Sequence, residues 1–338
     1  MNQLSTQQLN DLLLGACLLA TGGGCTYAEK QTLLADSPQM KIIDCDELEP
    51  MATICTVYAV GSASVQTSDI RLQICLGMRA VEQLTDRPLD GIFAGEIGGE
   101  QLAMYTAGLM GLPVLDADGA GGRAVPEITQ DQFALYHRST TPAVVVDALG
   151  GVKILENLST QELEHEVRTR AMETQHLVFV FDHIMRVHES WLLNHGALHR
   201  SMKLGECLRT ISYTSLTALG IRLVDEATIL SVRTQDHGDF LRATVEMQGQ
   251  RGLYQMHIQN ENLILKRNGT PMVTCPNLIM LLSQNGRPIH NGELENLVDT
   301  CVTILAARAT PAWQGERGAM LFGPRRFGFP FDPVFNLA

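Results

Sequence analysis

The sequence predicts an α/β protein: an N-terminal layered domain with a mostly parallel sheet, followed by a smaller β-barrel-like domain. In the first half, short and nearly continuous apolar runs alternate with helical stretches, a pattern typical of buried parallel sheets. In the last third, apolar and polar residues alternate with a period of two, which predicts antiparallel strands. The length of 338 residues exceeds that of a typical single core, so we expect two domains.

The composition and charge exclude several classes of partner. Hydrophobic residues make up 45% and charged residues 18% of the chain, as in globular proteins. A formal net charge of −12 repels a phosphate backbone, so we expect no nucleic-acid partner. The apolar run 12–20 follows no basic residue and is too short for a bilayer span, which predicts a cytoplasmic protein with no membrane partner. Because soluble enzymes commonly form closed symmetric assemblies, a homo-oligomer is expected.

The eight cysteines are scattered and form neither a C-x-x-C pair nor a zinc-ribbon spacing. We interpret them as reduced and mostly buried thiols. The alternative is a disulfide framework, which belongs mainly to short secreted chains that cannot build a core.

The N-terminal segment predicts two helices joined by a glycine turn. A capping box at Ser5 precedes an apolar face that extends to Leu19, and a second capping box begins at Thr26. Between the two helices lies Thr21-Gly22-Gly23-Gly24. Backbone N–H groups beside a helix start can bind an anion, and glycines let the backbone approach a small ligand closely. These four residues are therefore candidate substrate-binding residues; the alternative is a tight turn between two helices.

Five β-rich runs follow in the first half, with helices between them. The candidate strands are 40–45, 52–60, 91–94, 113–116 and 143–147, and the candidate helices are 68–84 and 99–109. Alternation of strands and helices, with apolar strands, predicts one buried sheet. We assign residues 1–160 to this α/β domain.

The second half changes character twice. Residues 161–204 carry Glu, Arg and His at helical spacing, and we assign them to a helical segment of one or two helices. Residues 205–338 form the predicted β-rich domain, because period-two runs recur with turns between them. These runs are 211–213, 228–232, 241–245 and 253–259.

Polar residues gather after three consecutive strands of the first half. In a parallel sheet, the loops at the carboxyl ends of the strands line the ligand crevice. Paired carboxylates there can divide acid and base roles or share a divalent metal, and an arginine can hold an anionic group. The alternative is that each carboxylate caps a helix or closes a turn. The candidate residues are Ser62, Glu96, Gly98, Gly99, Asp116, Asp118 and Arg123.

Five histidines fall between residues 176 and 199. The spacing of His188, His195 and His199 places them on one helical face if the helix is continuous, and such a face can bind a metal. The alternative is a partly solvated helix, because Asn194-His195-Gly196 is also a helix stop signal. Asp182-His183 is a pair that could orient an imidazole, although adjacent residues do not face one another on a helix.

Several motifs, in this order, resemble those of the S-methyl thiohydantoin desulfurase family. They are 15–24 (GACLLATGGG), 95–99 (GEIGG), 111–119 (GLPVLDADG), 122–127 (GRAVPE), 260–262 (NEN), 275–279 (CPNLI), 286–289 (GRPI) and 323–328 (GPRRFG). The resemblance implies an α/β domain, a β-barrel-like domain, a small-molecule substrate and hydrolytic loss of a thiol from an S-methylated thiohydantoin. It also adds Glu127 to the candidate substrate-binding residues.

Hydrolysis at C2 of such a ring needs an activated water, stabilisation of developing charge and a proton for the departing thiolate. We hypothesise that Glu96 is the general base, that Asp116 or Asp118 is the acid or holds a divalent metal, and that Arg123 binds a substrate carboxylate. The sequence departs from the family pattern after the second strand, where Gly61-Ser62-Ala63 replaces Gly-x-Pro and no Glu-Lys pair follows. This departure supports an alternative, a non-catalytic small-molecule-binding or regulatory protein.

Overall fold

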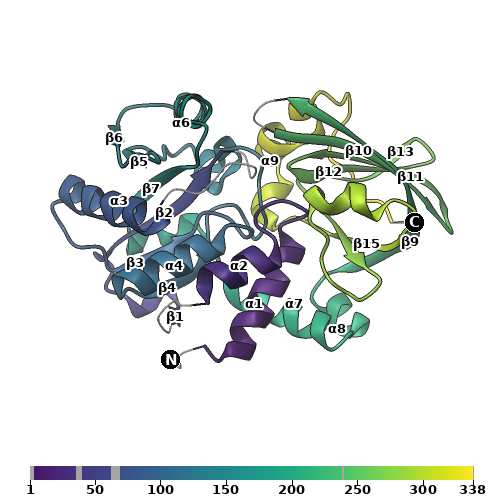
Figure 1. The fold of residues 1–338 in the computed structure, drawn as a ribbon, viewed down its shortest axis with the longest axis horizontal. Coiled ribbons are helices and arrows are strands. Elements are labelled where there is room, and N and C mark those ends of the chain that lie inside the picture. Colours follow the sequence, from purple (N-terminus) through teal and green to yellow (C-terminus); the bar gives the residue numbers. More distant parts are fainter. Residues whose placement is uncertain (1–3, 36–39, 62–68, 238–239, 338) are drawn as a thin grey trace. The chain divides into compact units, whose positions relative to one another are not determined.

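A computed structural model describes residues 4–35, 40–61, 69–237 and 240–337 (Figure 1). Contacts within the chain divide it into two compact units. Unit 1 comprises Met1–Ser5, Thr32–Ala120 and Glu127–Ala197, and unit 2 comprises Thr6–Gln31, Gly121–Pro126 and Leu198–Ala338. Both units are therefore discontinuous in sequence.

Unit 1 is built on sheet A, with the strand order β1-β4-β3-β2-β7-β5-β6 and with β8 paired to β4. The neighbours β1, β4, β3 and β2 run parallel, and β7, β5 and β6 add antiparallel pairs. Strands β3, β4 and β5 are buried along their whole length, as expected for the interior of such a sheet. The strands are β1 (Ile42–Ile43), β2 (Thr53–Val60), β3 (Gly91–Ala94), β4 (Val114–Asp118), β5 (Ala143–Val146), β6 (Val152–Leu155), β7 (Val178–Arg186) and β8 (Asn194–His195).

Helices cover sheet A, and their ends follow local capping chemistry. The carboxylate of Asp69 accepts a hydrogen bond from the N–H of Leu72 at 3.1 Å and starts α3, which packs against β7 and β5 (Figure 1). Helix α4 packs against β3 and β2, and a capping box at Ser159 starts α6. The helices of this unit are α3 (Ile70–Thr85), α4 (Glu100–Met110), α5 (Gln132–Leu135) and α6 (Thr160–Thr174), with short 3-10 turns η1 (Cys45–Glu47), η2 (Ile128–Gln130) and η3 (Val187–Leu192).

Unit 2 is built on sheet B, an antiparallel sheet with the strand order β13-β12-β11-β10-β9-β15-β14. The sheet curls into a half-barrel, so that the amide of Asn262 on β12 donates to the carbonyl of Ile279 on β14 at 3.0 Å. The predicted fold class is thus confirmed. The strands are β9 (Arg222–His237), β10 (Phe240–Gly249), β11 (Gly252–Gln259), β12 (Glu261–Arg267), β13 (Thr270–Thr274), β14 (Leu278–Ser283) and β15 (Cys301–Ala307).

Helices α1 and α7 cross closely within unit 2, because a glycine on each lies at the contact (Figure 1). A Cβ atom at Gly15 would lie 1.8 Å from the carbonyl oxygen of Ser201, and one at Gly205 would lie 1.7 Å from that of Asp11. Arg209 on α7 also binds both carboxylate oxygens of Asp11, at 2.8 and 3.0 Å. The remaining elements are α1 (Thr6–Leu19), α2 (Tyr27–Leu34), α7 (Ala197–Arg209), α8 (Tyr213–Ala218), α9 (Glu316–Phe322), η4 (Asn291–Leu297), η5 (Pro311–Gln314) and η6 (Pro324–Phe327).

Two predicted elements differ from the structure. The expected helical segment 161–204 contains strand β7 between α6 and α7, because the run 178–181 (VFVF) is an apolar strand buried between β2 and β5. The expected strand 211–213 instead leads into α8, whose first turn is capped by Ser212. Across the described ranges, none of the helices is both long and apolar enough to cross a bilayer.

Candidate functional site

The loops after β3 and β4 lie side by side at the carboxyl edge of sheet A. The N–H of Gly119 donates to the carbonyls of Ala94 and Gly95, at 3.0 and 3.1 Å. These bonds connect the loop that carries Glu96 with the end of the strand that carries Asp116 and Asp118. The structure therefore places these three predicted residues at one edge of unit 1.

Asp118 is fully buried, and both of its carboxylate oxygens have partners. One oxygen accepts the N–H of Ala120 at 2.8 Å, and the other accepts the amide of Asn194 at 2.7 Å. The second bond ties β8 to the end of β4, where the two strands pair. Asp118 thus fixes the loop after β4, as the alternative interpretation from the sequence expected of a turn carboxylate.

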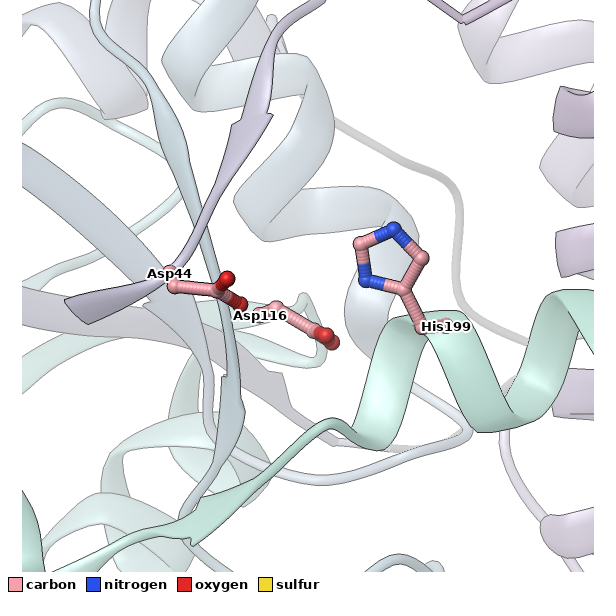
Figure 2. Close-up of side chains that lie close together, drawn as sticks. All are labelled: Asp44, Asp116 and His199. Atoms are coloured by element: carbon pink, nitrogen blue, oxygen red, sulfur yellow. The ribbon is translucent and has the colours of Figure 1, made fainter. Parts of the chain in front are cut away.

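Asp116 is also buried, and its carboxylate approaches that of Asp44 (Figure 2). One carboxylate oxygen of each residue lies within 4.8 Å of the other. Asp44 is exposed and follows β1, the parallel neighbour of β4. Two carboxylates at this distance can contribute oxygen ligands to a hard cation. Figure 2 also draws His199, which lies in the first turn of α7 and belongs to unit 2.

Sequence reasoning missed Asp44. It lies inside the expected strand 40–45, where a residue near the end of a short strand gives no separate signal. Its partner Asp116 was found because the motif that carries it ends a clearly apolar strand. The pair depends on the parallel register of β1 and β4, which the sequence does not specify.

Cys45 is a buried thiol next to these carboxylates. Burial raises the pKa of Cys45 to about 11, the nearby carboxylate of Asp116 acts in the same direction, and a hydrogen bond with Ser190 opposes both. The thiol is therefore neutral at physiological pH. A neutral thiol is a poor nucleophile and a poor metal ligand, so Cys45 does not serve as a thiolate here.

The loop between β3 and α4 holds Glu96 half-buried. A Cβ atom at Gly99 would lie 3.7 Å from a carboxylate oxygen of Glu96, so this carboxylate lies over the start of α4. Gly98 has a φ of +137°, which favours glycine, and its N–H donates to the carboxylate of Glu100 at 2.9 Å. Gly98 and Gly99 therefore shape the loop that presents Glu96.

Two other predicted residues have separate positions. Glu127 is half-buried in unit 1, and its carboxylate accepts the hydroxyl of Thr129 at 2.9 Å. Ser62 lies outside the described residues. Substrate binding by either residue remains a prediction.

The predicted glycine turn lies in unit 2, against sheet B and η4. A Cβ atom at Gly22 would lie 2.4 Å from the amide oxygen of Asn291, and one at Gly23 would lie 2.1 Å from a carboxylate oxygen of Glu261. The carbonyl of Thr21 accepts the N–H of Asn262 at 2.8 Å. Close packing within unit 2 accounts for two of the glycines, and Gly24, with a φ of +68°, turns the chain.

Arg123 is fully buried in unit 2 and bonds to backbone carbonyls. Its Nε donates to the carbonyl of Ala124 at 2.9 Å, and its Nη1 donates to the carbonyls of Pro276 and Asn277. The guanidinium carbon lies 4.4 Å from the centre of the Phe322 ring. These contacts hold the segment 121–126 to α9 and to the connection between β13 and β14, and binding of a substrate carboxylate by Arg123 remains a prediction.

The predicted histidine face does not form. His188 lies in η3 and contacts the carbonyl of Pro50 at 3.1 Å, whereas His195 lies in β8 and contacts the carbonyl of Ser190 at 2.7 Å. Of the three, only His199 is in an α-helix, α7. The prediction was wrong because the chain turns at Gly196, which has a φ of +76°, as the helix stop signal indicated.

Sheet A contains a buried network of ionisable groups that sequence reasoning did not assemble. The ring nitrogens of His183 contact Asp182 at 2.5 Å and Asp131 at 2.8 Å, and the hydroxyl of Tyr58 donates to the other oxygen of Asp182 at 2.7 Å. We call these four residues the His183 network. Asp182 and His183 can face each other because β7 is irregular there and His183 has a φ of +51°.

Charge stabilises the His183 network. Burial opposes protonation of the imidazole, but Asp182 and Asp131 outweigh burial and raise the pKa of His183 to about 10. Burial and the carboxylate of Asp182 raise the pKa of Tyr58 well above its ordinary value. At neutral pH the network therefore holds an imidazolium between two aspartates and a protonated tyrosine.

Comparisons with known proteins identify a family and the fold. The sequence model described as S-Me-THD-like, N-terminal domain, matches residues 7–157, and the one described as S-Me-THD-like, C-terminal domain, matches residues 158–334. A crystal structure of a protein from Chromobacterium violaceum has a TM-score of 0.82 at 22% sequence identity, covering 99% of this chain and 100% of the other. No curated protein matches the chain.

Proposed function

The chain belongs to the S-Me-THD-like family, and we propose on this basis that it is a hydrolase that releases a thiol from an S-methylated thiohydantoin ring. The observation that carries the proposal is the match of both family domains, in order, over residues 7–334. The similar crystal structure supports the fold alone, because the two sequences are 22% identical.

The proposed reaction is a substitution at C2 of the ring. The oxygen of water forms a bond to C2, and the bond between C2 and sulfur breaks. One proton of the water goes to the departing methanethiolate and the other to the ring nitrogen, which yields methanethiol and a hydantoin. The step needs no oxidant or reductant. It needs one group that takes a proton from water and another that returns a proton to sulfur.

The carboxylates at the edge of sheet A suit these two roles. We assign Glu96 as the general base, since it is half-buried in the loop after β3. We assign the pair of Asp116 and Asp44 to the acid role, because one carboxylate oxygen of each lies within 4.8 Å of the other at this edge of unit 1. The same two oxygens would be the ligands of a divalent cation, which would polarise the ring or the water. Asp118 positions the loop.

The test is a thiol-release assay with S-methylated thiohydantoins, together with elemental analysis of the purified protein. We expect thiol release by the natural protein and a loss of at least a hundredfold in Glu96→Gln and in Asp116→Asn. Glu166→Gln is the matched control, because Glu166 pairs with Lys153 on the surface of unit 1 and has no assigned role.

The outcomes separate the candidate functions. Full turnover in both Glu96→Gln and Asp116→Asn would refute the assigned roles. Ligand binding by the natural protein without thiol release would favour the binding-protein alternative. A stoichiometric divalent metal that is lost in Asp44→Asn would assign the carboxylate pair to metal binding.

A further inference from the structure

The His183 network has no role in the mechanism above, and one of its four members is not fully buried. Asp131, Asp182 and His183 are buried, with exposed fractions of 5%, 0% and 4%. Tyr58 is half-buried. Tyr58 is therefore the least buried of these four residues.

The Tyr58 hydroxyl has a fixed orientation. Its proton is directed at one oxygen of Asp182, at 2.7 Å, and the other oxygen of Asp182 is held by His183 at 2.5 Å. The second ring nitrogen of His183 is held in turn by Asp131 at 2.8 Å. Because the hydroxyl proton is engaged, the oxygen of Tyr58 can meet a further polar group only as an acceptor, through its lone pairs. The network thus sets Tyr58 as a hydrogen-bond acceptor.

A second observation points to a ligand at the same place. Thr56 lies two residues before Tyr58, on the same face of β2, and is fully buried. Its hydroxyl has no hydrogen-bond partner among the residues that the structure describes, and such a buried hydroxyl is costly to leave unpaired. A Cβ atom at Gly95 would lie 3.2 Å from this hydroxyl and 3.3 Å from the ring of Tyr58. Both side chains therefore adjoin the loop that carries Glu96.

We propose that Tyr58 is a ligand-binding residue whose oxygen accepts a hydrogen bond from a ring N–H of a cyclic amide, and that Asp182, His183 and Asp131 position it. The hydroxyl of Thr56 is the second polar group available to the same ring. The choice of a cyclic amide rests on the proposed function, since hydantoin-type rings carry N–H groups. The network would then determine specificity, because Tyr58 would bind rings with an N–H donor more tightly than rings without one.

The test measures binding of two probes to the full chain by isothermal titration calorimetry. Hydantoin carries two N–H groups, and 1,3-dimethylhydantoin carries none. We expect the natural protein to bind hydantoin at least tenfold more tightly than the dimethyl probe, because the acceptor is left unpaired by the latter. Tyr58→Phe should reduce this ratio to about one by weakening hydantoin binding. The matched control is Tyr254→Phe, which removes a tyrosine–aspartate hydrogen bond of sheet B, 3.1 Å long, from unit 2.

His183→Gln tests the positioning role. This variant keeps the hydroxyl of Tyr58 but removes the imidazolium that holds Asp182. We expect the ratio of the two affinities to fall at least threefold, between the values for the natural protein and for Tyr58→Phe. A merely structural role would lower both affinities together and leave their ratio unchanged, which would overturn the positioning role.

The assay of thiol release separates this inference from the proposed function. The inference fails if Tyr58→Phe keeps the full ratio, or if the natural protein does not bind hydantoin at all. Thiol release that is independent of Tyr58 would keep the function and refute the inference. Hydantoin binding that depends on Tyr58, without thiol release from any S-methylated ring, would keep the inference and refute the function.

Discussion

Each unit contains a tyrosine that donates to a buried aspartate, and the two pairs differ in the other partners of the aspartate. In sheet B, Asp225 accepts the hydroxyl of Tyr254 at 3.1 Å and the N–H of Arg251 at 2.9 Å. These two bonds connect Asp225 on β9 to the hairpin that β10 and β11 form. In sheet A, Asp182 accepts the hydroxyl of Tyr58 and an imidazolium. Asp225 therefore holds a turn in place, whereas Asp182 belongs to a series of hydrogen-bonded ionisable side chains.

The difference shows that the hydrogen-bond partners of a buried carboxylate indicate its role. Backbone N–H groups satisfy a carboxylate wherever a turn must be fixed, and Asp118 and Asp225 share this pattern. A carboxylate that faces another ionisable group depends on the charge of its partner, so its energy changes with pH. The His183 network is of this second kind.

The largest effect is expected from His183→Gln. The substitution leaves two buried carboxylates, Asp182 and Asp131, without their shared cation, and breaking a buried ion pair in this way costs about 4 kcal/mol. Hydrogen exchange measured by mass spectrometry at pH 7 should show this loss as easier opening of β7. Unchanged protection of β7 would mean that the imidazole carries no charge in the folded protein.

The cost of His183→Gln should also depend on pH. The pKa of His183 is raised from 6.5 to about 10 in the folded protein. The stabilisation is therefore complete below pH 6.5 and is lost as the pH rises through about 10. Between pH 6 and pH 10, the difference in free energy of opening between the natural protein and the variant should narrow by roughly 4 kcal/mol. A constant difference over this range would contradict the network.

Gly23→Ala tests the structural use of a carboxylate in unit 2. The added Cβ would lie 2.1 Å from an oxygen of Glu261, so the side chain of Glu261 must move. We expect a decrease of about 2 kcal/mol in the free energy of unfolding of unit 2, measured by urea denaturation. Gly315→Ala is the control, because a Cβ there meets no atom within 4 Å. Equal stability of the two variants would refute close packing at Gly23.

Asp118→Asn should behave as a turn residue. The variant keeps the shape of the side chain but turns an acceptor into a donor that faces either the N–H of Ala120 or the amide of Asn194. We expect a loss of about 1.5 kcal/mol, with faster hydrogen exchange at the pairing of β4 and β8. If thiol release falls far more than this stability does, Asp118 belongs to the chemistry and its assigned role is wrong.

The smallest effect is expected from Tyr254→Phe. Asp225 keeps its bonds to the N–H groups of Arg251 and Glu226, so its carboxylate still has two donors. The free energy of unfolding of unit 2 should fall by about 1 kcal/mol, with no change in hydantoin binding. A loss of free energy of unfolding as large as that of His183→Gln would mean that the two tyrosine–aspartate pairs do not differ in their contribution to stability.

The fold was largely predictable, because it depends on local patterns. Apolar runs identified the parallel strands at 52–60 and 91–94, and period-two alternation identified β10 and β11. Strand β7 was missed because charged helical residues on both sides of it hid a short apolar run. A sequence pattern depends on residues that are adjacent along the chain, whereas β7 is stabilised by strands that are adjacent to it in the sheet.

The candidate site was predictable only where a motif ends a strand. Glu96, Asp116 and Asp118 were found in this way, but the sequence did not tell which carboxylate is held by backbone donors. The His183 network joins residues from β2, from β7 and from the N-cap of α5. Asp182 and His183 are adjacent in sequence, and their side chains can meet because His183 has a left-handed backbone conformation. Neither the register nor this conformation has a signature in one sequence.

The helix α1 is the first element of the chain, yet it packs in unit 2 against α7 and β14. A ribosome therefore releases α1 long before the residues that will cover its buried leucines, Leu12, Leu13 and Leu19, have been made. Until then this apolar face is exposed in the nascent chain and is a target for chaperones. For the same reason, we expect residues 1–160 produced alone to aggregate even if sheet A folds, because the apolar face of α1 would be uncovered.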